Sequence, residues 1–271
     1  LPGRAPGAAL GGIGGAAGSQ AGGMPIRIDR QRTSKKRLIM HWDFPVFRKA
    51  DLSEGDASET VAALPDRALD RGAAFAYVAG DDPRPLLVLR ECEYCVGSEV
   101  ALLSRTQEND RTLLMAQWFH CVKLPNDVLR DDHPFRKLFD EKNPAHLVLA
   151  NADGSDPLPL SGAQSQKDLW QRMGAVLAGA YTKDPERAAK AQYRLLAQLD
   201  HLDMREDELK SQLDLRIEKD GPASPKVRKL RNELEKIRTE RAKALADEEK
   251  IVDLGVLEKA PEDEAAGIGS K

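Results

Sequence analysis

Residues 85–95 read PLLVLRECEYC, an apolar run that ends on two cysteines with two residues between them. The run has the length of a strand and no alternation of polar residues, which indicates a strand buried on both faces. Residues 96–105 follow with the pattern of a helix. The sequence therefore predicts that Cys92 and Cys95 lie where a buried strand meets the N-terminus of a helix.

This position favours thiol chemistry. Backbone N–H groups and the macrodipole at a helix N-terminus stabilise a thiolate over a thiol. Two cysteines one turn apart form the minimal unit for thiol–disulfide exchange, with Cys92 as the nucleophile and Cys95 as the resolving thiol. Glu91 and Glu93 work against this effect, because neighbouring carboxylates raise a thiol pKa, and Arg90 offsets them in part. We therefore expect a less acidic thiol than in a strongly oxidising site.

Around the cysteine pair, the sequence predicts a mixture of helices and strands that indicates a small α/β sandwich. Residues 151–154 read NADG and predict a hairpin loop, because Asp-Gly tolerates a positive φ. Residues 107–111 are expected to form a polar loop. The predicted helices cover residues 56–71, 134–140 and 165–181, and the predicted strands cover residues 73–78, 86–89, 113–122, 146–150 and 158–160.

Residues 85–180 resemble the thioredoxin-like superfamily. The resemblance rests on the strand that ends at the CxxC, the helix after it, a proline that begins the strand leading to the Asp-Gly hairpin, and a final strand and helix. It implies that Pro144 is cis and faces the cysteines. It also implies a thiol–disulfide oxidoreductase acting on protein thiols, with Cys92, Cys95 and Pro144 as its catalytic residues. The Glu-Tyr between the cysteines departs from the usual Gly-Pro, so redox direction and substrate stay open.

The composition changes after residue 182. Residues 185–219 and 225–252 show no strand signal and repeat apolar residues every three or four positions, and DGPASP at 220–225 separates them. This pattern predicts an antiparallel helical hairpin of the coiled-coil type. Such a hairpin either packs on itself or self-associates, or it holds a helical partner through residues 186–252.

Four segments follow from these patterns. We expect a disordered segment over residues 1–37, first rich in Gly and Ala and then basic, and a thioredoxin-like domain over residues 38–182. The helical hairpin is expected over residues 183–254, and a disordered acidic tail over residues 255–271. The basic run DRQRTSKKR within the first segment is interpreted as a solvated flank of the domain, with contact to an anionic surface as the alternative.

The bulk composition excludes several classes of protein. A net charge of −3 over 271 residues offers no basic excess for binding nucleic acid. No run of about 18 apolar residues is present, so we expect no transmembrane segment. Three cysteines are too few for a disulfide scaffold. Residues 1–23 lack the basic start and apolar core of a secretory signal, which favours a cytoplasmic, bacterial-type protein, while an incomplete N-terminus leaves export open.

Two other interpretations of the cysteines remain. Zinc would suit three thiolates and an imidazole, with Cys121 and either His120 or His133 joining the pair. Neighbours on a strand point to opposite faces, so only one of His120 and Cys121 could join. Cys121 alone is expected to be a small core residue. The remaining interpretation is a non-catalytic interaction or scaffold protein whose hairpin binds a partner. We expect neither a metal nor a cofactor in the oxidoreductase.

Overall fold

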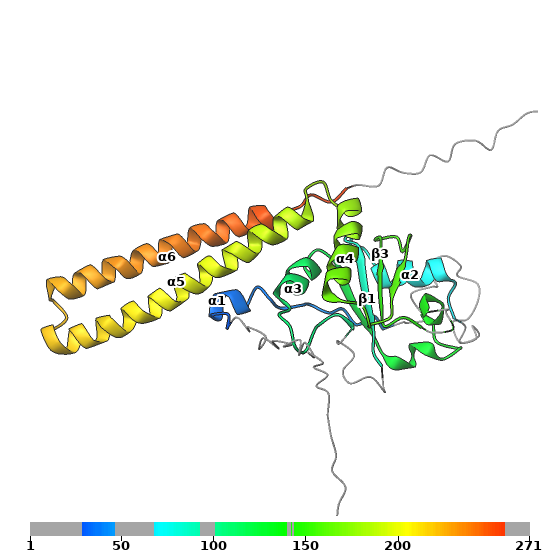
Figure 1. Ribbon diagram of the computed structural model, residues 1–271, viewed down its shortest axis with the longest axis horizontal. Coiled ribbons are helices and arrows are strands. Elements are labelled where there is room, and N and C mark those ends of the chain that lie inside the picture. Colours follow the sequence, from blue (N-terminus) through cyan, green and yellow to red (C-terminus); the bar gives the residue numbers. More distant parts are fainter. Residues whose placement is uncertain (1–28, 47–67, 93–100, 140–141, 143, 258–271) are drawn as a thin grey trace, which may run out of the picture.

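A computed structural model of the chain describes residues 29–46, 68–92, 101–139, 142 and 144–257. Figure 1 shows an α/β body from which a long helical hairpin extends. In chain order the elements are α1 (Arg32–Lys35), α2 (Arg71–Ala79), β1 (Leu86–Arg90), α3 (Asp110–Ala116), β2 (His120–Leu124), the 3₁₀ helices η4 (Asn126–Leu129) and η5 (Arg136–Phe139), β3 (Leu147–Ala150), β4 (Leu158–Leu160), α4 (Gln166–Ala180), α5 (Pro185–Asp220) and α6 (Pro225–Val252).

The strands form one open sheet in the order β2-β1-β3-β4, which confirms the predicted mixed α/β class. Strand β1 runs parallel to β2 and antiparallel to β3, and β4 pairs only with β3. The predicted strands at residues 86–89, 146–150 and 158–160 are all present. Every residue of β1 and β3 is buried, as their continuous apolar runs indicate. Pro159 lies on the edge strand β4, the position in which a sheet tolerates proline.

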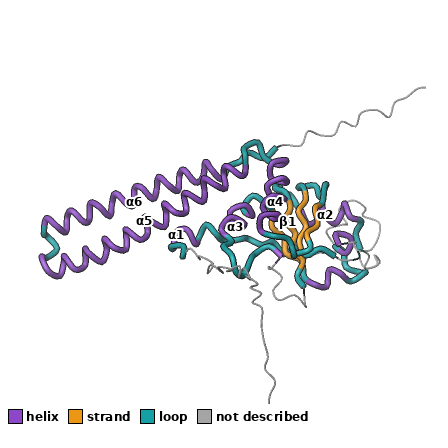
Figure 2. The backbone as a smooth tube through the Cα atoms, in the orientation of Figure 1, coloured by secondary structure: helices purple, strands orange, loops and turns teal. Residues whose placement is uncertain are grey.

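Helices cover both faces of the sheet. Successive residues of β1 point to opposite faces, so Leu87 and Leu89 pack on one core and Leu86 and Val88 on the other. Helices α3 and α4 cover the first face. Helix α2 and the 3₁₀ helices cover the second. Figure 2 shows the strands between α4 and α2. The central strand β1 is therefore enclosed on all sides except at its ends.

One predicted strand is a helix. Residues 73–78 belong to α2, whose first turn is capped by Asp70, because its side chain accepts a hydrogen bond from the Ala73 N–H. The alanine-rich run favours a helix, and it buries Phe75 and Val78 on one face. The helix predicted over residues 56–71 lies mostly outside the described residues, and Arg71 begins a helix instead of ending one.

The prediction for residues 107–122 is also corrected. Residues 110–116 form α3, and only residues 120–124 form a strand. Helix α3 buries most of its residues, so its apolar run carries no visible helical period. The helix predicted over residues 96–105 does not reach residue 105. Ser104 and Asn109 instead close a turn, with the Ser104 N–H donating to Asn109 Oδ1 at 2.8 Å.

Three local predictions are confirmed. The helix predicted over residues 165–181 is present as α4, and Ser165 caps it by accepting from the Asp168 N–H. The loop after β3 turns at Gly154, whose φ is 75°. A Cβ at this position would collide with the side chain of Phe75, so the turn requires glycine both for its backbone conformation and for space. The predicted helix at residues 134–140 is present as the short 3₁₀ helix η5.

Helices α5 and α6 lie side by side and form the hairpin seen in Figure 1. At about 1.5 Å per residue, the 36 residues of α5 span about 54 Å. Each helix begins with a proline after a capping side chain, Asp184 for α5 and Ser224 for α6. Two apolar clusters join the helices; they contain Leu202, Leu209, Leu234 and Ile237 in one and Leu195, Leu199 and Ala244 in the other. None of the described helices is long and apolar enough to cross a bilayer.

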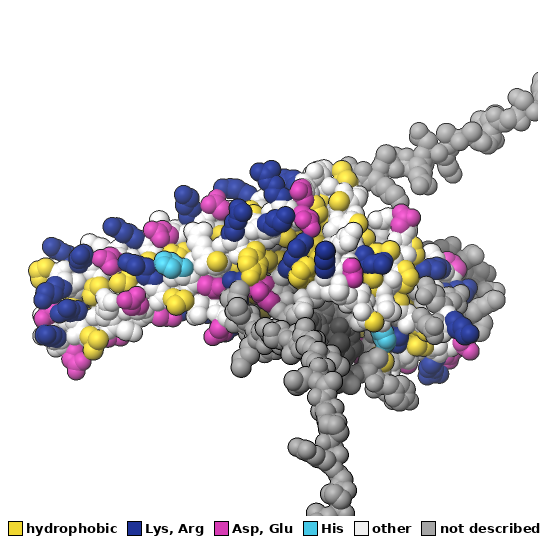
Figure 3. Space-filling model, in the orientation of Figure 1, with side chains coloured by type: hydrophobic (Ala, Val, Ile, Leu, Met, Phe, Trp, Pro, Cys, Tyr) yellow, Lys and Arg dark blue, Asp and Glu magenta, His cyan; other side chains and the backbone are white. Residues whose placement is uncertain are grey.

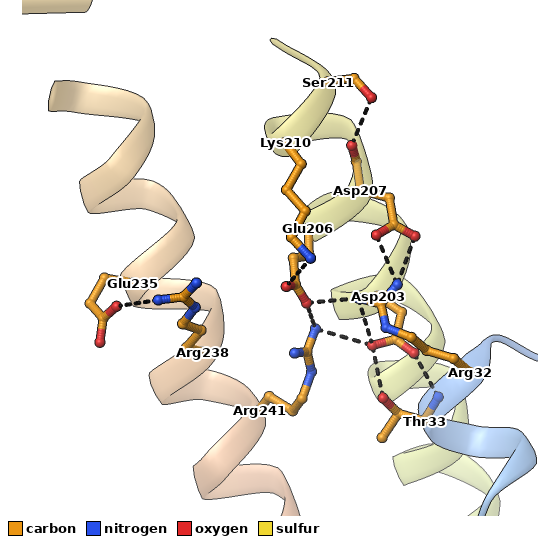
Figure 4. Close-up of polar contacts among 10 residues, drawn as sticks. All are labelled: Arg32, Thr33, Asp203, Glu206, Asp207, Lys210, Ser211, Glu235, Arg238 and Arg241. Atoms are coloured by element: carbon orange, nitrogen blue, oxygen red, sulfur yellow. Dashed lines mark hydrogen bonds and ion pairs between the residues drawn. The ribbon is translucent and has the colours of Figure 1, made fainter. Parts of the chain in front are cut away.

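The prediction that residues 1–37 are disordered is wrong for residues 29–37, which dock on the hairpin. Arg30 is buried and contacts Asp110 of α3 and Asp200 of α5 at 2.6 and 2.8 Å. Figure 4 shows that α1 lies against the acidic face of α5, where Thr33 binds the buried Asp203. The basic run is therefore not a solvated flank. It connects the α/β body to the hairpin through ion pairs.

The disorder predicted from residue 255 onward is wrong for residues 255–257. Gly255 accepts a hydrogen bond from the Thr182 N–H at 2.8 Å, and the Leu257 N–H donates to Ala180 at 2.8 Å. Residues 255–257 thus pair with the junction between α4 and α5. Residues 258–271 lie outside the described part of the chain.

Candidate functional site at the carboxyl end of β1

Cys92 leaves the sheet at the carboxyl ends of two parallel strands. The Glu91 N–H donates to the Leu124 carbonyl at 2.8 Å, so the ladder between β1 and β2 continues to the residue before Cys92. In α/β proteins, the carboxyl ends of parallel strands are where ligands and catalytic groups gather. Cys92 is partly buried and takes part in a disulfide bond. Cys95 lies outside the described residues.

Pro144 lies at the same end of the sheet. The Arg90 N–H donates to the His146 carbonyl at 2.9 Å, which extends the antiparallel pairing of β1 and β3. Pro144 comes two residues before His146, and its carbonyl accepts from Arg90 Nη2 at 3.2 Å. The structure thus brings Pro144 to the end of the strand that carries Cys92. The expected cis bond involves residue 143, which is outside the described residues.

Arg90 lies beneath this site and is only 5% exposed. Its guanidinium donates to the carbonyls of Ala145 and Glu91 at 3.1 and 3.2 Å, in addition to that of Pro144. Within the described part of the chain, no carboxylate contacts it. Burial lowers the pKa of Arg90, yet a guanidinium stays charged at any ordinary pH. A positive charge without a carboxylate partner is therefore buried beside the Glu91–Cys92 peptide.

His146 shares this environment. Its Nδ1 lies 3.3 Å from Arg90 Nη2, and because a guanidinium can only donate, Nδ1 accepts the hydrogen bond. Burial lowers the pKa of His146, and the charge of Arg90 lowers it further. The imidazole is thus neutral at neutral pH and adds no second positive charge.

Glu91, the residue before Cys92, is paired. Its carboxylate lies 3.3 Å from Lys123 Nζ on the parallel strand β2. Sequence reasoning counted Glu91 as a charge that raises the thiol pKa. Lys123 offsets that charge, as does the buried Arg90. Glu93, the second expected opposing carboxylate, lies outside the described residues.

Sequence reasoning missed Lys123 and His146 as members of this site. A signal for Lys123 is present in the sequence: it is the one charged residue of the run that forms β2. His146 follows Pro144 by two residues, and the proline was already assigned to the site. Both residues could have been found from their positions near the carboxyl end of β2 and the start of β3.

Cys121 lies at the other end of the sheet. In the parallel register Leu87 is opposite Cys121, so Cys92 comes five residues further along β1, about 16 Å away at roughly 3.3 Å per residue. The thiol of Cys121 is buried and donates to the Ala116 carbonyl at 3.4 Å. Burial raises its pKa to about 12. Cys121 is thus a core residue remote from Cys92.

The same register separates the expected zinc ligands. His120 is opposite Leu86, still further from Cys92 than Cys121 is. His133 uses Nδ1 to accept the Phe135 N–H at 3.1 Å. Among the described residues, no three His, Cys, Asp or Glu side chains are grouped as a metal ion requires. The metal interpretation therefore loses its third and fourth ligands.

Comparison with known proteins gives no relative for this chain: no family model, no curated protein and no solved structure matches it.

Proposed function

We propose that the protein is a thiol–disulfide oxidoreductase that acts on protein thiols through Cys92 and Cys95, on a thioredoxin-like α/β sandwich. One observation carries the proposal: the buried guanidinium of Arg90 donates both to the carbonyl of the Glu91–Cys92 peptide and to the carbonyl of Pro144. The resemblance to the superfamily places a cysteine after a buried strand and a proline before the neighbouring strand. Cys92 comes two residues after the end of β1, and Pro144 comes three residues before the start of β3, which supports the proposal.

The charges around Cys92 support a reactive thiol. The Glu91 carbonyl belongs to the peptide that leads into Cys92, and it accepts from Arg90 Nη1. A positive charge close to a cysteine favours the thiolate, which is the nucleophile in disulfide exchange. The Lys123–Glu91 pair removes part of the opposing negative charge. Among the described residues next to Cys92, two positive charges, those of Arg90 and Lys123, thus face the single carboxylate of Glu91.

In the reducing direction, the thiolate of Cys92 attacks one sulfur of a substrate disulfide. A mixed disulfide forms between Cys92 and the substrate, and the second substrate sulfur leaves as a thiolate that takes up a proton. The thiolate of Cys95 then attacks Cys92, which releases the first substrate sulfur as a second thiol. The protein gains a disulfide and the substrate loses one, so two electrons pass to the substrate. The oxidising direction reverses these steps from a disulfide-bonded Cys92.

The test compares insulin reduction by dithiothreitol in the presence of the native protein, Cys92→Ser and Cys121→Ser. The Cys121 variant is the matched control, because it removes a thiol far from the site. We expect the native protein and Cys121→Ser to accelerate insulin reduction and Cys92→Ser to give the rate of dithiothreitol alone. If Cys92→Ser accelerates reduction as the native protein does, the proposal is wrong.

The hairpin favours a second candidate function, that of a non-catalytic scaffold. Met204 and Leu215 on α5 are 60% and 65% exposed. This exposure is high for large apolar side chains, because most of the other leucines of α5 pack between α5 and α6. Such side chains suit a helical partner or a second copy of the hairpin. In that case Cys92→Ser would leave the binding of partners intact, while Met204→Lys together with Leu215→Lys would abolish it in a pull-down or sedimentation experiment.

A further inference from the structure

A cavity of about 440 Å³ lies where helices α3, α4 and α5 meet, away from Cys92. Its apolar wall includes Leu114 from α3, Trp170 from α4 and Tyr193 from α5. The size falls within the range of small-molecule sites, which is about 300–1,000 Å³. Figure 3 shows hydrophobic and basic side chains next to each other where α5 joins the α/β body.

The two aromatic rings of the cavity are held in place by their polar atoms. Trp170 Nε1 donates to Thr112 Oγ1 at 2.9 Å, and the Tyr193 hydroxyl donates to Glu108 Oε1 at 3.0 Å. Their hydrogen-bonding groups are therefore satisfied by the protein. Arg111 lies over the Trp170 ring at 4.7 Å and Arg30 lies over the Tyr193 ring at 4.9 Å. Each ring therefore offers a ligand the apolar surface that its arginine leaves uncovered, in a fixed orientation and at little cost in side-chain entropy.

Three basic side chains of the same cavity carry more charge than the protein neutralises. Arg111 and Lys190 share the single carboxylate of Glu186, at 2.7 and 3.5 Å. Arg194 forms no ion pair with any described residue. The acidic side chain in the wall, Glu108, lies 3.6 Å from Arg30, which Asp110 and Asp200 already neutralise. Three basic side chains therefore face the two carboxylates of Glu108 and Glu186, and one positive charge is left in excess at the cavity.

We propose that this cavity binds a compact aromatic anion, a carboxylate or sulfonate on one or two fused rings. The rings would pack on Trp170 and Tyr193, and the acid group would pair with Arg194. A cationic ligand would be repelled by the three basic groups. A small inorganic anion would leave the apolar wall without contacts, so only its attraction to the basic side chains would favour binding.

The experiment uses two fluorescent probes with the full chain. Anilinonaphthalene sulfonate carries the negative charge, and N-phenylnaphthylamine has the same ring system without it. Both are titrated into the native protein, Arg194→Gln and the matched control Arg231→Gln, which removes an exposed charge from α6 outside the cavity. We expect saturable binding of the sulfonate that is about fivefold weaker in Arg194→Gln, the loss typical of one exposed ion pair.

The neutral probe and the control variant separate this site from general hydrophobic binding. N-phenylnaphthylamine should bind Arg194→Gln as it binds the native protein, and the sulfonate should bind Arg231→Gln as it binds the native protein. Equal binding of the sulfonate to all three proteins would overturn the proposal, as would an equal loss of both probes in Arg194→Gln. Arg194 is exposed, and circular dichroism of each variant checks that the fold is unchanged.

Discussion

Two buried arginines show how the same side chain is used in two regions of this molecule. Arg90, at the carboxyl end of β1, is surrounded by carbonyl oxygens of Glu91, Pro144 and Ala145. Arg30, at the junction with the hairpin, is surrounded by carboxylates of Asp110 and Asp200. Both are 5% exposed. The difference lies only in the charge of their partners.

The partners set opposite pKa shifts. Burial lowers the pKa of Arg90, and nothing compensates. Burial also acts to lower the pKa of Arg30, but the hydrogen bonds that Arg30 donates to Asp200 and Asp110 outweigh it, and the net shift is upward. A neutralised cation contributes to stability, because removing it leaves buried carboxylates. The charge of Arg90 is not neutralised by a carboxylate of the described residues, and its guanidinium donates to the carbonyl of the peptide that leads into Cys92.

The largest effect is expected from Arg30→Ala. The substitution leaves Asp110 and Asp200 without their buried partner, and breaking a buried ion pair from one side costs about 3–5 kcal/mol. Urea unfolding followed by circular dichroism measures the loss. Lys35→Ala is the control, because its pair with Asp29 is exposed, and it should change stability by less than about 0.5 kcal/mol. Similar losses in both variants would contradict the account.

The next largest effect is a pH dependence of the hairpin. Burial acts to raise the pKa of Glu206, but hydrogen bonds from Lys210 and Arg241 outweigh it and lower the pKa to about 2. Since this value lies below the ordinary value of 4.5, the stabilisation is present above pH 4.5 and is lost as the pH falls towards 2. We expect Glu206→Gln to remove about 3 kcal/mol of this acid-dependent loss.

Unfolding by urea at several pH values between neutral and acidic tests the Glu206 prediction. Glu240→Gln is the matched control, because it removes an exposed carboxylate from α6. Its pH profile should follow that of the native protein. If Glu206→Gln and the native protein lose stability in parallel on acidification, Glu206 does not have a lowered pKa in the folded state.

The smallest change should be seen at Cys121. Because burial raises its pKa to about 12, its thiolate fraction near pH 8 is about 10⁻⁴. In the reduced native protein, we therefore expect iodoacetamide to modify Cys92 and to leave Cys121 unmodified until the protein unfolds. Peptide mass spectrometry after a short pulse of reagent measures both sites. If Cys121 were modified as fast as Cys92, its thiol would be accessible in the native protein, which would contradict its buried position.

The sequence predicted those parts of the fold that depend on local pattern. The apolar run of β1 and the leucine repeats of α5 and α6 each indicate their structure within a short stretch of sequence. Residues 73–78 and 113–116 were expected to be strands but belong to the helices α2 and α3, because a short apolar run fits a buried strand and a buried helix equally well. In α2 the Asp70 cap decides the outcome.

The part that could not be predicted depends on contacts far apart in the chain. Arg30 meets Asp200, which is 170 residues away, so nothing near the basic run indicates that it is docked. The acidic residues of α5 are visible in the sequence, but a charged helix face is usually solvated. In the same way, Arg90 could be assigned to the site from its place before Cys92, while its burial among carbonyls required the fold of residues 144–146.

The pKa of Cys92 in the reduced protein tests the central claim most directly. It is measured from the pH dependence of alkylation at Cys92 in the native protein, Arg90→Lys and Arg90→Met. In the native protein, we predict that the pKa of the Cys92 thiol is below the ordinary value of about 8.5. Arg90→Lys should leave this pKa lowered, and Arg90→Met should raise it by about one unit. An ordinary pKa in all three proteins would contradict the claim that the buried charge of Arg90 activates this cysteine.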